Sequence, residues 1–281
     1  MTAGAPAWLD ELPAELSGQR RIMRRLRAYC AASPDVRWLL VGCSLARGAA
    51  DRLSDLDLGA GVVPERFEEA ALGLRAAMAG LGELVDSFHH QLPGVPDPHE
   101  RIFAQYADRC QVDLVVLPAQ QPDGELPPAL VIYDPDGMIS SRGRAGQITP
   151  EQAREWAFLG WCALVDLGKY LRRGSAWEAL DRLNEARSML WRLWAAAHGV
   201  PDPQYGLVSV LDFAPDETPA ELADTVAGLD QATLLAAARR LADLLRATGA
   251  ELPAELRAAL PDPMEAFVIA DLADLAARET G

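Results

Sequence analysis

Two aspartates separated by a single residue, Asp55 and Asp57, form the most chemically informative pattern in the sequence. Because side chains at positions i and i+2 of a strand project to the same side, both carboxylates are expected on one face. Leu56 and Leu58 are then expected to point into a core. Neighbouring carboxylates repel each other unless a cation neutralises them, and hard cations such as Mg²⁺ prefer oxygen ligands. The pair therefore predicts a site for a divalent metal ion.

A third aspartate, Asp113, is the only charged residue in the apolar run Gln111–Leu117. A lone carboxylate in a buried strand is costly unless it is paired or bound to a cation. Three carboxylates on neighbouring strands could hold one or two magnesium ions, which suits phosphoryl or nucleotidyl transfer. Two alternatives stay open: Asp113 could form a structural ion pair, and Asp55 with Asp57 could lie in a surface hairpin.

A turn of small residues precedes the aspartate pair. It begins at Gly42, Cys43 and Ser44, directly after the predicted strand Val36–Val41. The Ser44 hydroxyl could contact a phosphate group, or it could cap a helix that begins at Leu45.

The rest of the chain predicts the elements that must hold these residues. In the first part we expect helices over 11–32 and 65–81 and strands over 36–41, 53–62, 83–88, 101–106, 111–117 and 130–133, with a hairpin between 106 and 111. Thr149 and Pro150 then mark a helix start. Helices are expected over 150–172, 176–198, 219–248 and 262–279. The predicted fold is a small mixed-sheet α+β domain at 1–148, followed by an α-helical bundle domain at 149–281.

The segment from Val41 to Leu58, VGCSLARGAADRLSDLDL, resembles the signature of the polymerase-beta-type nucleotidyltransferase superfamily. That signature has a Gly-Ser or Gly-Gly turn, a spacer, an Asp-x-Asp and a third aspartate on a later strand. The segment is especially similar to the antibiotic, aminoglycoside-type nucleotidyltransferases, which the later RIFAQYADRCQVDLVVL, VIYDPDG and GKYL also fit. One position departs from the family pattern, because Cys43 stands where glycine usually precedes the serine. Either Cys43 occupies the glycine position or the turn is shifted.

The resemblance implies a magnesium-dependent nucleotidyltransferase with one or two Mg²⁺ ions held by Asp55, Asp57 and Asp113. A hydroxyl group of a small molecule would attack the α-phosphorus of a nucleoside triphosphate, with ATP the favoured donor and AMP the group transferred. Pyrophosphate would leave. An aminoglycoside-like antibiotic is one acceptor that the resemblance suggests.

The resemblance also implies contacts to the triphosphate. The residues expected to make them are Gly42, Ser44, Arg47 and, from the helical part, Lys169. A surface salt bridge is the alternative for Arg47, and a solvated lysine on a helix face is the alternative for Lys169.

The general base has four candidates: Glu178, Glu185, Asp86 and Glu100. The first two share a face of helix 176–198, where a solvated surface with Arg182 paired among the acids is the alternative. Two other functions also stay open. One is a protein-nucleotidylating enzyme of toxin-antitoxin type, and the other is a catalytically silent nucleotide-binding module.

The amino-acid composition limits the classes of molecule that the protein is expected to bind. The chain has 281 residues with 41 acidic and 26 basic side chains, a formal net charge of −15. Such a chain is not expected to grip extended nucleic acid or an anionic membrane, but it suits a cationic acceptor. No apolar run is long enough for a bilayer, and the acidic N-terminal segment lacks the basic and apolar parts of a secretory signal. The four cysteines lack zinc-site spacing. We therefore expect a cytoplasmic protein.

Two further patterns carry weaker expectations. His89 and His90 adjoin the predicted strand 83–88 but lack partners for a metal site. Trp177 and Trp194, with leucines between them, fit one helical stripe, which predicts that both pack in the bundle core.

Overall fold

The computed structural model describes residues 6–91, 98–120, 129–139, 148–219 and 221–279. The chain divides into two compact units, Met1–Ala145 and Gly146–Gly281, which we call the N-terminal unit and the helical unit. This division lies a few residues before the predicted boundary at 148. Residues 1–5 of the N-terminal segment and residue 220 of the predicted helix 219–248 lie outside the described residues.

A six-stranded mixed sheet forms the N-terminal unit, which confirms the predicted fold class. Its strands are β1 (Val36–Val41), β2 (Leu56–Val62), β3 (Leu84–His90), β4 (Glu100–Tyr106), β5 (Gln111–Pro118) and β6 (Leu130–Tyr133). They lie in the order β3-β4-β5-β2-β1-β6. Strands β2 and β5 are parallel, and the other neighbouring pairs are antiparallel. The predicted hairpin is confirmed as β4–β5.

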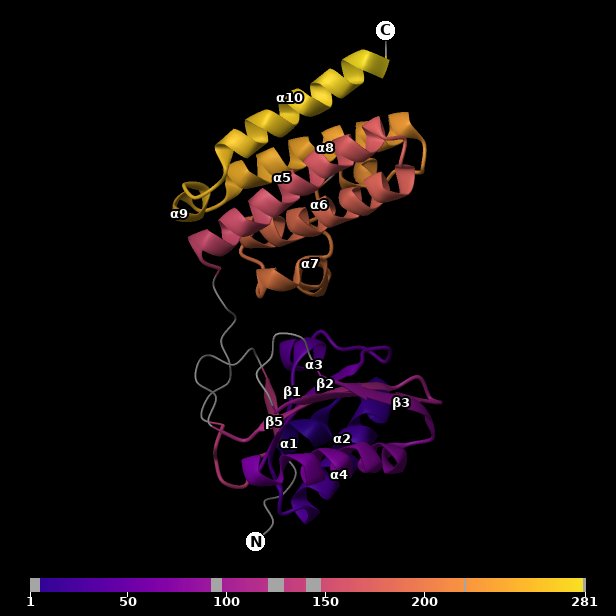
Figure 1. Cartoon of the computed structure of the whole chain (residues 1–281). Coiled ribbons are helices and arrows are strands. Elements are labelled where there is room, and N and C mark those ends of the chain that lie inside the picture. Colours follow the sequence, from indigo (N-terminus) through magenta and orange to yellow (C-terminus); the bar gives the residue numbers. More distant parts are fainter. Residues whose placement is uncertain (1–5, 92–97, 121–128, 140–147, 220, 280–281) are drawn as a thin grey trace. The chain divides into compact units, whose positions relative to one another are not determined.

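Helices α2 and α4 cover one face of this sheet (Figure 1). The helical segments of the unit are α1 (Ala7–Glu11), α2 (Ser17–Ala32), α3 (Cys43–Arg47) and α4 (Phe67–Leu81), with 3₁₀ turns at Ala14–Leu16 and Pro64–Arg66. Leu56 and Leu58 are buried against the covered face, as predicted. Helix α2 begins later than the expected residue 11 because Pro13 lacks a backbone donor and holds Leu12 in an extended conformation.

The opposite face of the sheet, which we call the second face, changes character across its width. At the β1 side Trp38 and Leu40 form a small apolar cluster with Ala119. Gly61 of β2 is needed there, because a Cβ at this position would lie 2.0 Å from Cε2 of the Trp38 indole. Toward β3 the second face carries polar and aromatic side chains instead.

The helical unit is an α-helical bundle, as predicted. Its helices are α5 (Pro150–Arg172), α6 (Ala176–Ala197), α7 (Leu207–Phe213), α8 (Gln231–Glu251), α9 (Ala254–Arg257) and α10 (Asp262–Glu279), with 3₁₀ turns at Pro203–Tyr205 and Leu222–Thr225. Thr149 and Gln152 form a capping box at the start of α5. Among the described residues, no helix has both the length and the apolar character needed to cross a bilayer.

Two expectations for the bundle are wrong. The predicted helix 219–248 is interrupted, and α8 starts at Gln231 because the Asp230 side chain caps it by accepting a hydrogen bond from the Thr233 backbone. Trp177 does not pack in the core: it is 72% exposed, whereas Trp194 is buried. Trp177 lies on the same side of α6 as Asp181 and Asn184, which are also exposed, whereas Ala179 in the first turn is buried in the core.

Candidate active site

The sheet brings two of the three predicted carboxylates into direct register. Asp57 on β2 and Asp113 on β5 are paired positions of the parallel ladder. Both lie on the second face, since their neighbours Leu56, Leu58 and the apolar residues of β5 fill the covered face. Neighbouring strands lie about 4.8 Å apart, so the two carboxylates start from adjacent backbone positions.

Asp55 lies just before β2, two residues from Asp57, and is exposed. Its negative charge contributes to the raised pKa of Asp57.

The Asp57 carboxyl lies in an environment that disfavours its charge. Burial raises its pKa above the ordinary value, and the charges of Asp55 and Asp113 raise it further. A hydrogen bond from the Cys43 thiol and the positive charge of Arg47 act in the opposite direction without cancelling the rise. An acidic group whose pKa is raised by neighbouring carboxylates is a candidate for cation binding.

Arg101 of β4 forms an ion pair with Asp113 that sequence reasoning missed. Its Nε donates to Asp113 Oδ1 at 2.8 Å, and its Nη2 donates to Oδ2, so the contact is bidentate. These hydrogen bonds raise the pKa of Arg101 above its ordinary value. The structural ion pair considered for Asp113 is therefore present. Only the cross-strand register could have identified Arg101 as the partner.

The turn after β1 places Cys43 in an unusual backbone conformation. Cys43 has φ +50°, in the left-handed region that favours glycine, whereas Gly42 is extended. This conformation is the one expected if Cys43 stands at a position that suits glycine. Its half-buried thiol bonds to Asp57, and burial, followed by this hydrogen bond, raises the thiol pKa to about 12.

Ser44 and Arg47 lie on the short helix α3 that continues from this turn. The helix begins at Cys43 with Gly42 at its N-cap position. Ser44 therefore lies within the helix and is not its cap. The Gly42 backbone N–H donates to the Asp57 carbonyl at 2.8 Å, which fixes the turn beside the carboxylates. Arg47 is near enough to lower the pKa of both Cys43 and Asp57.

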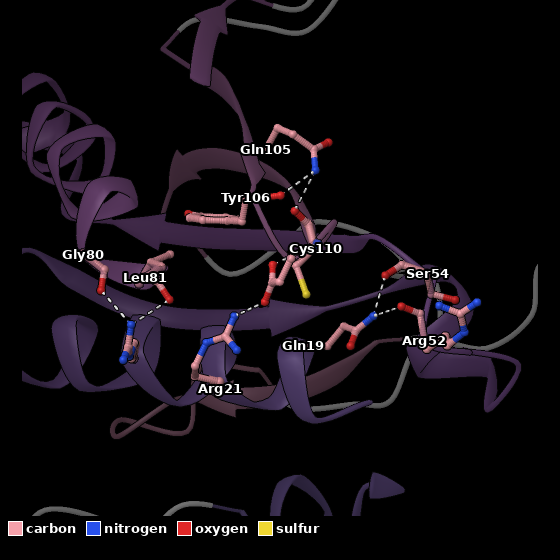
Figure 2. A network of polar contacts seen from close by, with 11 residues as sticks. Gln19, Arg21, Arg52, Ser54, Gly80, Leu81, Gln105, Tyr106 and Cys110 are labelled. Carbon is pink, nitrogen blue, oxygen red and sulfur yellow. Dashed lines mark hydrogen bonds and ion pairs between the residues drawn. The ribbon is translucent and has the colours of Figure 1, made fainter. Parts of the chain in front are cut away.

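Gln19 of α2 is a second residue that sequence reasoning missed. Its side chain is almost fully buried, and its Nε2 donates to the carbonyl of Ser54 at 2.9 Å and that of Arg52 at 3.3 Å (Figure 2). It also approaches the Asp51 carbonyl at 3.4 Å. One glutamine thus holds the loop that leads into Asp55. A polar residue on the apolar stripe of α2 was the available signal.

The predicted phosphate contact Lys169 belongs to the helical unit. Its Nζ lies 2.5 Å from Asp166 Oδ1 and 4.6 Å from the ring centroid of Tyr170. A role of Lys169 toward the nucleotide stays a prediction.

The base candidates of the helical unit also have local partners. Glu178 accepts a hydrogen bond from Ser175, and Arg182 pairs with Glu185 and with Asp181. This is the paired helix surface that was the alternative to a catalytic wall.

The two remaining base candidates lie on different faces of the sheet. Glu100 points to the covered face, where its Oε1 lies 3.2 Å from Arg75 Nε, so it faces away from Asp113. Asp86 pairs in register with Gln105, two positions along β4 from Phe103, and shares the second face with Asp113. The alternation of side chains along β3 and β4 therefore places Asp86 and Glu100 on opposite faces of the sheet.

The carboxylate oxygens fit Mg²⁺ in kind, since all three donors are hard. In the described part of the chain, however, no three His, Cys, Asp or Glu side chains are already arranged as a metal-binding group. The Arg101 guanidinium holds both Asp113 oxygens, so a metal ion would have to share or replace this contact.

No protein-family model matches the chain, and no curated protein matches it. Solved structures similar to it at low identity include the following two. One is an aminoglycoside 6-adenyltransferase from Bacillus subtilis, with 17% identity over 92% of this chain and 98% of that chain and a TM-score of 0.41. The other is a nucleotidyltransferase-like protein from Exiguobacterium sibiricum, with 11% identity over 82% of this chain and 76% of that chain and a TM-score of 0.33. Sequence identities and TM-scores this low support no argument about function.

Replacing Asp57 by asparagine should raise the melting temperature of the metal-free protein near neutral pH. The pKa of Asp57 is raised in the folded state, so its charged form costs stability above that pKa, and the cost disappears below the unfolded value. Thermal unfolding in a chelator at several pH values measures this. The gain should shrink as the pH falls toward 3.8, the ordinary value.

Asp108→Asn is a control of opposite sign, because Arg21 lowers the pKa of Asp108. It should lose stability at neutral pH. A lower melting temperature for Asp57→Asn than for the wild type would contradict the prediction.

Cys43→Gly should unfold at higher urea concentration than Cys43→Ala. Both variants remove the thiol, but only alanine keeps a Cβ at φ +50°. The difference should be about 1 kcal/mol. Equal stability would show that the turn relaxes out of the left-handed region.

Proposed function

We propose that the protein is a nucleotidyltransferase that moves a nucleoside monophosphate from a nucleoside triphosphate to a hydroxyl group of a small molecule. The observation that carries this proposal is the register of Asp57 with Asp113 on parallel strands, with Asp55 two residues before Asp57. A site of this kind needs acidic ligands beside a turn that can receive phosphate, and the turn at Gly42–Arg47 adjoins it.

In this reaction Asp55, Asp57 and Asp113 would hold Mg²⁺, which would supply Lewis-acid charge to the reacting phosphate and to the acceptor hydroxyl. The turn receives the β- and γ-phosphates: Ser44 can donate its hydroxyl hydrogen, and the Arg47 guanidinium offsets negative charge. The Arg101 guanidinium orients the Asp113 carboxylate on the second face.

The chemical step is an in-line displacement at the α-phosphorus. The acceptor oxygen forms a new bond to this phosphorus, and the bond to the oxygen that bridges to the β-phosphate breaks. The electron pair of the broken bond leaves with pyrophosphate, and the hydroxyl proton passes to a general base. Positioning and electrostatic stabilisation account for most of the acceleration in such reactions.

ATP is the proposed donor and Mg²⁺ the proposed ion, as the sequence resemblance implies. The proposed acceptor is a hydroxylated amine such as an aminoglycoside, which the net charge of −15 favours. Lys169 is proposed to reach the same triphosphate from the helical unit.

Magnesium-dependent release of pyrophosphate tests this proposal directly. Each nucleoside triphosphate is incubated with a panel of aminoglycosides, lincosamides and other hydroxylated amines. Release should require one acceptor and should fall more than about a hundredfold in Asp57→Asn, a variant expected to stay folded. Absence of release from the whole panel, with ATP still bound, would exclude these small-molecule acceptors.

One observation favours a second candidate, a catalytically silent nucleotide-binding module. The bidentate contact with Arg101 already satisfies Asp113, as in a site that no longer takes a metal ion. A protein-nucleotidylating enzyme of toxin-antitoxin type would share the same carboxylates and is distinguished by its acceptor.

Arg101→Met distinguishes the active site from the silent module. If a metal ion competes with the guanidinium for Asp113, the variant should bind Mn²⁺, a spectroscopic probe for Mg²⁺, about tenfold more tightly. Without metal the variant should lose about 1–3 kcal/mol of stability, because Asp113 loses its partner. Paramagnetic resonance titration and urea unfolding measure these effects.

The matched control is Arg172→Met, which breaks a bidentate pair with Asp271 in the helical unit. It should lose stability without changing Mn²⁺ affinity. Unchanged Mn²⁺ binding in Arg101→Met would favour the silent module.

A further inference from the structure

Three ring-bearing side chains gather on the second face beside the candidate active site. The Phe88 and His90 rings lie 5.5 Å apart between centroids, and the His90 and Phe103 rings are stacked at 5.9 Å. Phe88 is 63% exposed, which is unusual for so large an apolar side chain. We call these three residues the aromatic surface.

The aromatic surface is continuous with the carboxylates through strand register. Phe88 on β3 pairs with Phe103 on β4, Phe103 pairs with Asp113 on β5, and Asp113 pairs with Asp57 on β2. These four positions form one row across the sheet, with a step of about 4.8 Å between strands. The row therefore runs from the candidate metal ligands to an exposed phenyl ring.

Arg101 connects the aromatic surface with the carboxylates. Its guanidinium carbon lies 4.4 Å from the Phe103 ring centroid while its nitrogens bind Asp113. The ion pair neutralises this cation, so the aromatic surface offers ring faces rather than free positive charge. Such a surface is poorly suited to a triphosphate.

We propose that the aromatic surface binds the acceptor, and that the acceptor is a polyhydroxylated ring, with or without amino groups, lying against the exposed ring of Phe88. This proposal rests on the proposed nucleotidyltransferase function and specifies the substrate class of its second site.

The geometry of in-line transfer favours the acceptor, rather than the nucleotide phosphates, as the group that lies on the aromatic surface. The attacking hydroxyl and the leaving pyrophosphate must lie on opposite sides of the α-phosphorus. The phosphate-binding turn lies at the end of β1, on one side of Asp57. Strands β5, β4 and β3 follow on the other side, so an acceptor on the aromatic surface would approach the α-phosphorus from the side opposite the turn.

The chemistry of the rings indicates the class of acceptor. The face of a phenyl ring carries partial negative charge, and it attracts C–H groups and ammonium groups that lie over it. A cyclic polyol offers an apolar face of C–H groups and hydroxyls at its edge. Amino substituents would add a cation–π contact, in keeping with an acidic chain.

The test compares Phe88→Ala with the wild type, using an acceptor and a nucleotide from the pyrophosphate assay. Phe88→Ala should raise the KM of the acceptor about tenfold and leave the KM of the nucleotide within about twofold. Phe88→Tyr keeps the ring and should restore the acceptor KM. The exposed position of Phe88 leaves the melting temperature nearly unchanged, and Phe88→Leu provides a second ring-free variant.

Val85→Ala is the matched control, because Val85 is 65% exposed on the same strand but lies outside the register row. It should leave both KM values unchanged. A rise in nucleotide KM alone would assign the aromatic surface to the nucleobase and overturn the proposal, as would unchanged kinetics in Phe88→Ala. Failure of the whole panel to release pyrophosphate would instead remove the proposed function, and the acceptor site with it.

Discussion

The parallel pairing of β2 with β5 brings two carboxylates to adjacent positions, and much of the N-terminal unit serves to keep them there. Asp57 and Asp113 would repel each other in this register, and burial adds to the cost of charging Asp57. The fold offsets this repulsion with cations and donors from other elements, namely Arg101 of β4, Arg47 of α3 and the Cys43 thiol. An arrangement that is costly without a ligand is expected where a ligand completes it.

The same constraint explains the contacts around the start of β2. The Gly42 backbone N–H donates to the Asp57 carbonyl, the Cys43 thiol hydrogen-bonds to the Asp57 carboxyl, and Gln19 holds the loop before Asp55. These contacts come from α2 and from the turn that follows β1. Residues that must present ligands within a fraction of an ångström are best placed on strands and held by buried polar contacts.

Much of this could be predicted from the sequence, since it depends on short-range patterns. Alternation places Asp57 opposite the core-facing leucines, and the apolar run around Asp113 makes it a strand, so both lie where they were expected. The β4–β5 hairpin and the capping box of α5 follow equally local rules.

The remainder depends on which strands become neighbours. Arg101 meets Asp113 only because β4 lies beside β5, and Gln19 reaches the loop before β2 only because α2 packs nearby. Trp177 shows a limit of periodicity: an apolar residue of a helix need not lie on the face that packs, and Trp177 lies on the exposed side with Asp181.

The sheet order also bears on the two edges of the sheet. Strand β3 is an edge strand, and an exposed edge bearing a phenyl ring invites another chain to add a strand. A register irregularity between Leu84 and Asp86 interrupts its ladder, and charged or ionisable side chains follow at Asp86 and His89. At the other edge, β6 has only four residues. An apolar ring can therefore stay open to solvent on this sheet without turning the edge into a template for aggregation.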